Sequence, residues 1–311
     1  MLDHEAAALL AAITEQNLPP LAEGSVADAR LRVPDPSFAQ GPPLPLAAVV
    51  DRAIPGPAGE LPVRIYTPEG DGPFPLVVYF HGGGFVIGSI ATADQGCRLI
   101  AREAGAVVIS VGYRLAPEHP YPAAPEDCYA AVKWVAAHAP ELAGDPQRLV
   151  VAGDSAGANL AAVVSIMARD RGGPEIAHQV LLYPNVDLTN NEYPSKDVEN
   201  AKGYMLEKED IDWFYSHYLT DPARAGEAYA SPLLATSHAG LPAATVITAG
   251  FDPLRDEGAA YVDALQGSGV PAEHLSYPSL IHGFYWFPAL ITEAHGVAAE
   301  IGRRLRSALS N

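Results

Sequence analysis

Short apolar runs recur along the chain from residue 75 onward, each separated from the next by a longer segment of mixed polarity. The runs are rich in β-branched residues and nearly apolar throughout, which is typical of strands covered on both faces. They read PLVVYF, AVVISV, RLVVAG, HQVLLYP and AATVITAG, with AEHLSYP as the last strand. Between them lie TADQGCRLIAREAG, PEDCYAAVKWVAAHA and AGANLAAVVSIMARD, which we expect to be helices. This alternation predicts an α/β fold in which a mostly parallel central sheet is wound with helices on both faces.

The chain before this alternation follows a different pattern. Residues 1–16 predict an amphipathic helix, and the Pro-rich stretches VPDPSF and GPPLPL should then run as an irregular arm to about residue 45. Two β-patterned segments, AAVVDRAI and LPVRIYTP, flank the turn-rich PGPAGE. At the other end, residues 293–309 predict a terminal helix.

One segment interrupts the alternation. Residues 186–220 contain the aromatic stretch EKEDIDWFYSHYL and are too long for a plain strand-to-helix loop. We interpret them as a helical cap that covers the carboxyl edge of the sheet together with the arm; a peripheral structural excursion is the alternative. The predicted organisation is an arm (1–45), an α/β domain (46–185 and 221–311) and a cap insertion (186–220).

Charge and composition narrow the classes of partner. The 311 residues carry a formal net charge of −18 and only four lysines, with no basic stripe, so nucleic acids and anionic membrane surfaces should be repelled. The N-terminus lacks the positive charge of a signal peptide, and no apolar run reaches the length of a membrane span. We therefore expect a cytoplasmic protein, and the two cysteines, Cys97 and Cys128, should be buried thiols rather than a disulfide. The sequence leaves open whether the protein forms a homodimer.

The first chemical signal is the sequence GDSAG at residues 153–157, which lies between an apolar strand and a helical stretch. A nucleophilic serine needs its hydroxyl exposed at the top of a sheet, and a sharp strand-to-helix turn provides that position. Glycines 153 and 157 avoid a clash with neighbouring elements. The alternative is an ordinary helix start capped by Ser155 or Asp154.

A second motif would stabilise the oxyanion that forms when a serine attacks a carbonyl. The strand PLVVYF ends in His81 and three consecutive glycines, a pattern typical of the oxyanion loop of lipases and esterases. The N–H of Ala156, directly after the serine, should be a further donor. The glycine spacing does not fit a phosphate loop or a dinucleotide fingerprint. We expect His81 to hold the loop in place rather than to act as a base.

The base and its orienting acid should follow Ser155 in the chain. Asp252 comes directly after the strand AATVITAG, and His282 lies in the loop after the last strand, so both side chains should emerge at the carboxyl edge. Asp256 and Glu257 are alternatives for the acid, although Asp256 more naturally begins the next helix.

Five motifs occur in order across residues 75–285: HGGGFVIGS, YRLAPEHPYPAAPED, GDSAGANLA, DPLRDEG and HGF. Together they resemble the hormone-sensitive lipase-like family of bacterial esterases, which have the α/β-hydrolase fold. The resemblance implies a carboxylesterase that needs no metal or cofactor and prefers esters with short or medium acyl chains. It also implies a cap built from the arm and the insertion. The implied site residues are Ser155 as nucleophile, Asp252 as acid, His282 as base, and Gly83, Gly84 and Ala156 as oxyanion donors.

The pocket is the least determined part of this interpretation. The insertion is rich in aromatic residues although the chain as a whole is not, at 8%. We expect an apolar acyl or alcohol pocket lined by aromatic side chains of the insertion and the arm, unless these simply pack the cap onto the domain. The candidates are Phe38, Tyr204, Trp213, Phe214 and Tyr218.

Three other functions remain possible at this point. An amidase or lactonase could use the same three residues. A small-ligand receptor could use the same fold, although receptors of this kind have lost the histidine that His282 supplies here. A protein-interaction module has only the acidic surface in its favour. The loop YRLAPEHPYPAAPED should be structural, tied by polar contacts of Arg114, Glu118 and His119.

Overall fold

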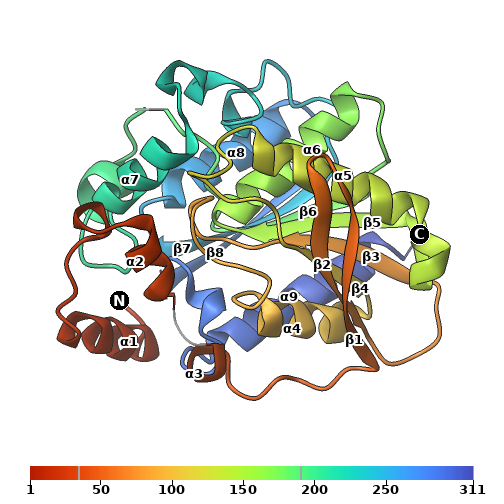
Figure 1. The fold of residues 1–311 in the computed structure, drawn as a ribbon, viewed down its shortest axis with the longest axis horizontal. Helices are drawn as coiled ribbons and strands as arrows, with labels where there is room; N and C mark the ends of the chain where they lie inside the picture. The colour runs from red at the N-terminus through yellow and green to blue at the C-terminus, as the bar shows by residue number, and fades with distance from the viewer. Residues whose placement is uncertain (34–35, 190, 311) are drawn as a thin grey trace.

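The computed structural model describes residues 1–33, 36–189 and 191–310. A sheet of eight strands runs through the molecule in the order β1-β2-β4-β3-β5-β6-β7-β8 (Figure 1). The β1–β2 and β2–β4 pairs are antiparallel, and every other neighbouring pair is parallel. The predicted α/β fold with a mostly parallel sheet is confirmed. The strands are β1 (Ala48–Gly56), β2 (Gly59–Thr67), β3 (Phe74–Phe80), β4 (Val107–Val111), β5 (Gly144–Asp154), β6 (His178–Leu182), β7 (Ala243–Phe251) and β8 (Ala272–Ile281).

Helices cover both faces of the sheet, which explains why the central strands are apolar throughout. Along β3, Val78 and Phe80 belong to one core while Val77 and Tyr79 belong to the other, as the alternation of side chains along a strand requires. Helices that pack on the first core include α5 (Ala123–Ala137), α6 (Ala156–Asp170) and α8 (Arg255–Gly267). Helices that pack on the second include α4 (Asp94–Ala104) and α9 (Glu293–Ala308).

The arm is more regular than its sequence suggested. After α1 (His4–Glu15), a capping box between Ser25 and Asp28 starts a short helix, α2 (Val26–Leu31), and α3 (Pro36–Gln40) follows. The expectation of an irregular arm overlooked this capping box. Of the Pro-rich stretch VPDPSF, residues 34 and 35 lie outside the described residues.

The insertion contains a π-helical turn, η3 (Ser195–Glu199), and the helix α7 (Lys208–Tyr218). The helix packs against η1 (Leu21–Glu23) of the arm, and α7 and α2 lie on the same side of the molecule (Figure 1). Within the part of the chain that the structure describes, no helix is long and apolar enough to cross a membrane. Both cysteines are buried and free.

Candidate active site

Ser155 stands at the sharp turn between β5 and α6. Its backbone angles, φ 55° and ψ −120°, are a strained conformation for a residue with a side chain, and they raise the hydroxyl above the sheet. Both flanking glycines are required by close backbone approach. A Cβ on Gly153 would lie 2.3 Å from the carbonyl oxygen of Gly157, and one on Gly157 would lie 2.0 Å from that of Phe80.

The three residues predicted as a triad meet in one chain of hydrogen bonds. His282 Nε2 lies 2.9 Å from Ser155 Oγ, and His282 Nδ1 lies 2.9 Å from Asp252 Oδ2. Asp252 is fully buried, and its second oxygen accepts a hydrogen bond from the N–H of Leu254. Because the carboxylate accepts a hydrogen bond from an N–H at Nδ1, Nε2 is left unprotonated as the acceptor for the serine hydroxyl. The adjacent parallel pairing of β7 and β8 places the acid and the base side by side.

The glycine loop after β3 leaves N–H groups free beside the serine. Gly83 and Gly84 have φ angles of 113° and 56°, which favour glycine. In the described part of the chain, neither N–H has an acceptor, and the N–H of Ala156 has none because it opens α6. The arrangement can therefore receive an oxyanion near Ser155.

Asp154, beside the nucleophile, holds the glycine loop against the turn. Its buried carboxylate accepts hydrogen bonds from the hydroxyl of Tyr79 at 2.9 Å, the N–H of Gly82 at 3.0 Å and the indole of Trp286 at 2.7 Å. Burial raises the pKa of Asp154 to about 6, and the three donors oppose this rise. Asp154 does not cap α6 as the alternative had it, because the N-terminus of this helix has no side-chain cap hydrogen bond. No local sequence pattern indicates this role.

His81 lies at the base of the same loop, as expected of a structural residue. Its ring is stacked on Tyr113 with centroids 4.3 Å apart, and Nδ1 lies 2.8 Å from the carbonyl oxygen of Gly82. Burial lowers the pKa of His81 to about 4, so the ring is neutral near pH 7.

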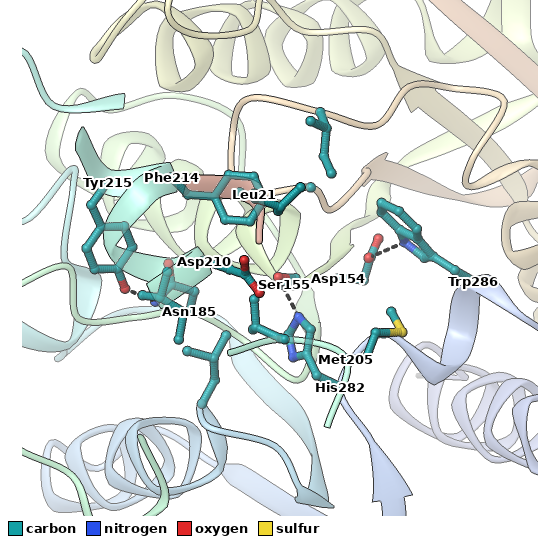
Figure 2. A pocket seen from close by; sticks show the side chains of 17 residues that line it. Leu21, Asp154, Ser155, Asn185, Met205, Asp210, Phe214, Tyr215, His282 and Trp286 are labelled. Carbon is teal, nitrogen blue, oxygen red and sulfur yellow. Dashed lines mark hydrogen bonds between the residues drawn. The ribbon is translucent and has the colours of Figure 1, made fainter. Parts of the chain in front are cut away.

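A cavity of about 140 Å³ opens over Ser155 and His282 (Figure 2). The arm contributes Leu21, and the insertion contributes residues of α7 and of the segment before it. The lining side chains are mostly apolar. They include Leu21, Ile87, Met205, Leu206, Ile211, Phe214, Tyr215, Leu254 and Trp286, together with Asp154, Asn185 and Asp210.

Phe214 alone of the five predicted aromatic candidates lines this cavity. The other four do not line it, which corrects the prediction. Three of them have other surroundings: Phe38 is 62% exposed, Tyr204 packs on the ring of Phe251, and Trp213 packs on Phe214 and His217.

Tyr218 is fully buried, and its ring is stacked on Phe85 with centroids 3.8 Å apart. The residues of α7 that do face the cavity, Asp210, Ile211, Phe214 and Tyr215, share one helix face. That spacing separates these residues from Trp213 but not from Tyr218, which lies four residues after Phe214 on the same face and is covered by Phe85.

The loop YRLAPEHPYPAAPED is tied by polar contacts, although within the described residues no hydrogen bond from the side chain of His119 contributes. The guanidinium of Arg114 forms a bidentate pair with Asp127. Glu118 accepts two hydrogen bonds from Arg30 of the arm, at 2.8 and 2.7 Å. Arg30 also donates to the carbonyl of Val86, so the arm is bound to the glycine loop.

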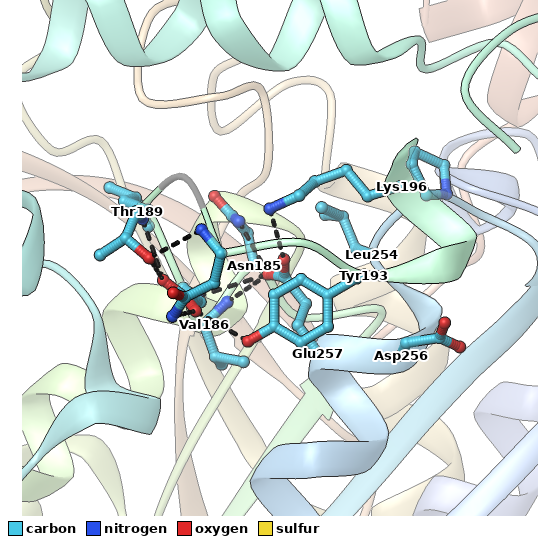
Figure 3. A network of polar contacts seen from close by, with 12 residues as sticks. Asn185, Val186, Thr189, Tyr193, Lys196, Leu254, Asp256 and Glu257 are labelled. Carbon is cyan, nitrogen blue, oxygen red and sulfur yellow. Dashed lines mark hydrogen bonds and ion pairs between the residues drawn. The ribbon is translucent and has the colours of Figure 1, made fainter. Parts of the chain in front are cut away.

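A buried polar network joins the insertion to the turn that carries Asp252 (Figure 3). Glu257 Oε1 accepts hydrogen bonds from the side chain of Asn185 at 2.9 Å and the N–H of Val186 at 2.7 Å. Lys196 is also buried, and its Nζ lies 3.8 Å from Glu257 Oε2. Asn185 lines the cavity, so the network forms part of its wall.

Asp256 has a different role from Asp252. Its Oδ2 accepts a hydrogen bond from the N–H of Ser195, and its Oδ1 accepts one from Arg255. It therefore anchors the insertion and makes no contact with His282. Among the described residues, no group of three or more histidine, cysteine, aspartate or glutamate side chains could hold a metal ion.

Comparison with known proteins agrees with this geometry. A family model described as alpha/beta hydrolase fold matches residues 77–286. The carboxylic ester hydrolase LipN of Mycobacterium tuberculosis is 49% identical over 76% of this chain, and the match spans 64% of LipN, just under two thirds of its length. The esterase LipI of the same organism is 45% identical over 80% of this chain and 79% of LipI.

Solved structures of esterases are similar to this chain over nearly its full length. A hyperthermophilic esterase from Pyrobaculum calidifontis is 40% identical with a TM-score of 0.93, covering 98% of both chains. An ester hydrolase from the metagenome of Lake Arreo, complexed with a derivative of bipyridine phosphonate, is 39% identical with a TM-score of 0.94 and full coverage of both chains. This chain belongs to the alpha/beta hydrolase family, and its resemblance to the hormone-sensitive lipase-like esterases is confirmed.

Proposed function

We propose that this protein is a carboxylesterase that hydrolyses small esters with short or medium acyl chains, with Ser155, His282 and Asp252 as its catalytic residues. The observation that carries the proposal is the unbroken chain of hydrogen bonds from Asp252 through His282 to Ser155 at the turn after β5. The proposal places the enzyme in the cytoplasm, acting on a small-molecule ester.

The reaction proceeds in two acyl transfers. Ser155 Oγ attacks the ester carbonyl carbon while His282 Nε2 takes the hydroxyl proton, and the imidazolium then gives that proton to the departing alcohol. Water next attacks the acyl-enzyme and gives one proton to His282, which returns it to Ser155 as the carboxylic acid leaves. Asp252 stabilises the imidazolium and fixes its tautomer throughout.

The oxyanion in each step is received by the N–H groups of Gly83, Gly84 and Ala156. Preorganised donors of this kind are each worth roughly 3–4 kcal/mol of transition-state stabilisation. The arm (1–45) and the insertion (186–220) together form the cap, while residues 46–185 and 221–311 form the catalytic domain. The support for the acyl preference is the small, mostly apolar cavity of about 140 Å³.

The test combines a substrate panel with a nucleophile variant. Hydrolysis of p-nitrophenyl esters of increasing acyl length should be fastest for short chains, and Ser155→Ala should remove nearly all of it. An organophosphate should label the native protein once, on Ser155. Ser216→Ala, on the outer side of α7, serves as the control and should keep activity. Labelling elsewhere, or full activity in Ser155→Ala, contradicts the assignment, and faster cleavage of matched amides or lactones favours the alternative leaving groups.

A further inference from the structure

The residues described as lining the cavity include carboxylates but no lysine or arginine. Two carboxylates that do not belong to the proposed triad line the cavity, namely those of Asp154 and Asp210. Most of the remaining surface is apolar, so the electrostatic interaction of a substrate with these carboxylates is weakly screened.

The two carboxylates differ in how much of their hydrogen-bonding capacity is used. Asp154 already accepts three hydrogen bonds and holds the glycine loop. In the described part of the chain Asp210 accepts one, from the N–H of Glu207 at 3.0 Å. A carboxylate offers about four acceptor positions, so Asp210 retains capacity toward the cavity. Figure 2 shows its side chain among the residues that line the space above Ser155.

The environment of Asp210 keeps this carboxylate incompletely solvated. Burial raises its pKa to about 6, while the N–H of Glu207 lowers it; the charges of Glu207 and Glu209 raise it, and Arg32 lowers it. The carboxylate is therefore ionised at neutral pH. A cation inside the cavity would restore part of the favourable interaction that the anion loses with water.

We propose that Asp210 is a specificity-determining residue that makes this cavity select esters bearing a positive charge over neutral esters of the same shape. This inference rests on the proposed esterase function and names a substrate class for it. The formal net charge of −18 acts in the same direction, because a negative field raises the local concentration of cations.

A purely structural role for Asp210 makes a different prediction. Asp210 belongs to the capping box at the start of α7, so its replacement also affects the helix. Loss of a cap lowers stability and changes the hydrolysis of charged and neutral esters alike. The ratio of kcat/KM for a cationic ester to kcat/KM for its neutral isostere separates the two roles, because effects common to both esters cancel.

The experiment uses two isosteric pairs on the full-length protein. The first is acetylcholine, the acetate ester of choline, and the acetate ester in which a tert-butyl group replaces its trimethylammonium group, which places the charge in the alcohol part. The second is the ethyl ester of glycine betaine and its tert-butyl isostere, which places the charge in the acyl part. Each ratio is measured for the wild type, Asp210→Asn and Asp212→Asn. The last is a matched control, because Asp212 lies on the same helix, pairs with Lys208 at 2.7 Å and does not line the cavity.

Asp210→Asn should lower the cationic-to-neutral ratio about tenfold in at least one pair, while Asp212→Asn leaves both ratios as in the wild type. A change below about threefold in both pairs, or an equal change in Asp212→Asn, overturns the inference. Neither result depends on absolute activity. If the wild type hydrolyses none of the four esters, the proposed esterase function itself has failed, which is a separate outcome.

Discussion

Gly84 is the residue at which the proposed oxyanion loop contacts the insertion. An alanine at this position therefore tests the catalytic role of the loop and its contact with the insertion. Its φ of 56° is unfavourable for alanine, which costs roughly 1–2 kcal/mol. More importantly, a Cβ on Gly84 would lie 2.2 Å from Cγ of Phe214, whereas ordinary contact begins at 3.4 Å. The loop and the ring must therefore move apart by roughly 1 Å, and a displacement of that size at a reacting centre costs about 100-fold in rate.

We expect Gly84→Ala to lower kcat for a short p-nitrophenyl ester about 100-fold, equivalent to about 2.7 kcal/mol of transition-state stabilisation. The control is Gly105→Ala. Gly105 ends α4 with a similar φ of 60° and has nothing within 4 Å of an added Cβ. This variant should lose roughly 1–2 kcal/mol of folding stability from the same backbone strain and keep its activity.

Removal of the ring should relieve the clash. In the double variant Gly84→Ala with Phe214→Ala, kcat should recover at least about tenfold relative to Gly84→Ala, with Phe214→Ala alone as the reference. If Gly84→Ala is fully active, the expected displacement of the oxyanion loop by the added Cβ is refuted. If activity is lost and the double variant shows no recovery, contact with Phe214 is not the cause, and the reasoning from the clash is refuted.

Three further predictions follow from contacts around the cavity. Asp252→Asn should lower kcat by about 10⁴ at unchanged melting temperature, whereas Asp256→Asn should act through stability, by about 1 kcal/mol; activity loss confined to Asp256→Asn would contradict the triad. In urea unfolding at about pH 9, above the pKa of about 8 to which burial raises Glu257, Lys196→Ala should cost about 3–5 kcal/mol because it leaves the Glu257 carboxylate buried without its counter-charge, while Lys202→Ala, in an exposed pair with Glu209, should leave stability almost unchanged; equal losses would refute the argument from burial. The cationic-to-neutral ratio of the wild type should rise between about pH 5 and pH 7 as the two carboxylates of the cavity, Asp210 and Asp154, ionise, since burial raises the pKa of each to about 6; this rise should be smaller in Asp210→Asn, and an equal rise in that variant would mean that Asp210 does not set the ratio.

The sequence was informative wherever a local pattern determines the structure. Each central strand was found because a buried strand must be apolar on both faces. The positions of Ser155, Asp252 and His282 followed from the rule that the carboxyl ends of parallel strands meet at one edge. Asp256 was separated from Asp252 by its place four residues further on, and the structure indeed gives it to Ser195 and Arg255.

Contacts between segments that are distant in the chain could not be predicted from the sequence. Nothing local shows that Asp154 accepts a hydrogen bond from Gly82 or that Glu257 faces Lys196, since these pairs are separated by many residues and meet only in the folded chain. The aromatic content of the insertion identified Phe214 but also Tyr218, because composition does not say which face of a helix looks into a cavity. The direction of α7 relative to the sheet decides that.

The contacts of residues 252–257 have a consequence for engineering by exchange of segments. The turn that presents Asp252 to His282 also supplies Asp256 and Glu257, which bind the backbone and the buried lysine of residues 186–196. A chimaera that received residues 186–220 from a relative would keep a turn shaped for a different partner. Its buried Glu257 would then lack a counter-charge directly beneath the catalytic acid. Transplants intended to change substrate range should therefore carry both segments, 185–220 and 252–257, as one unit.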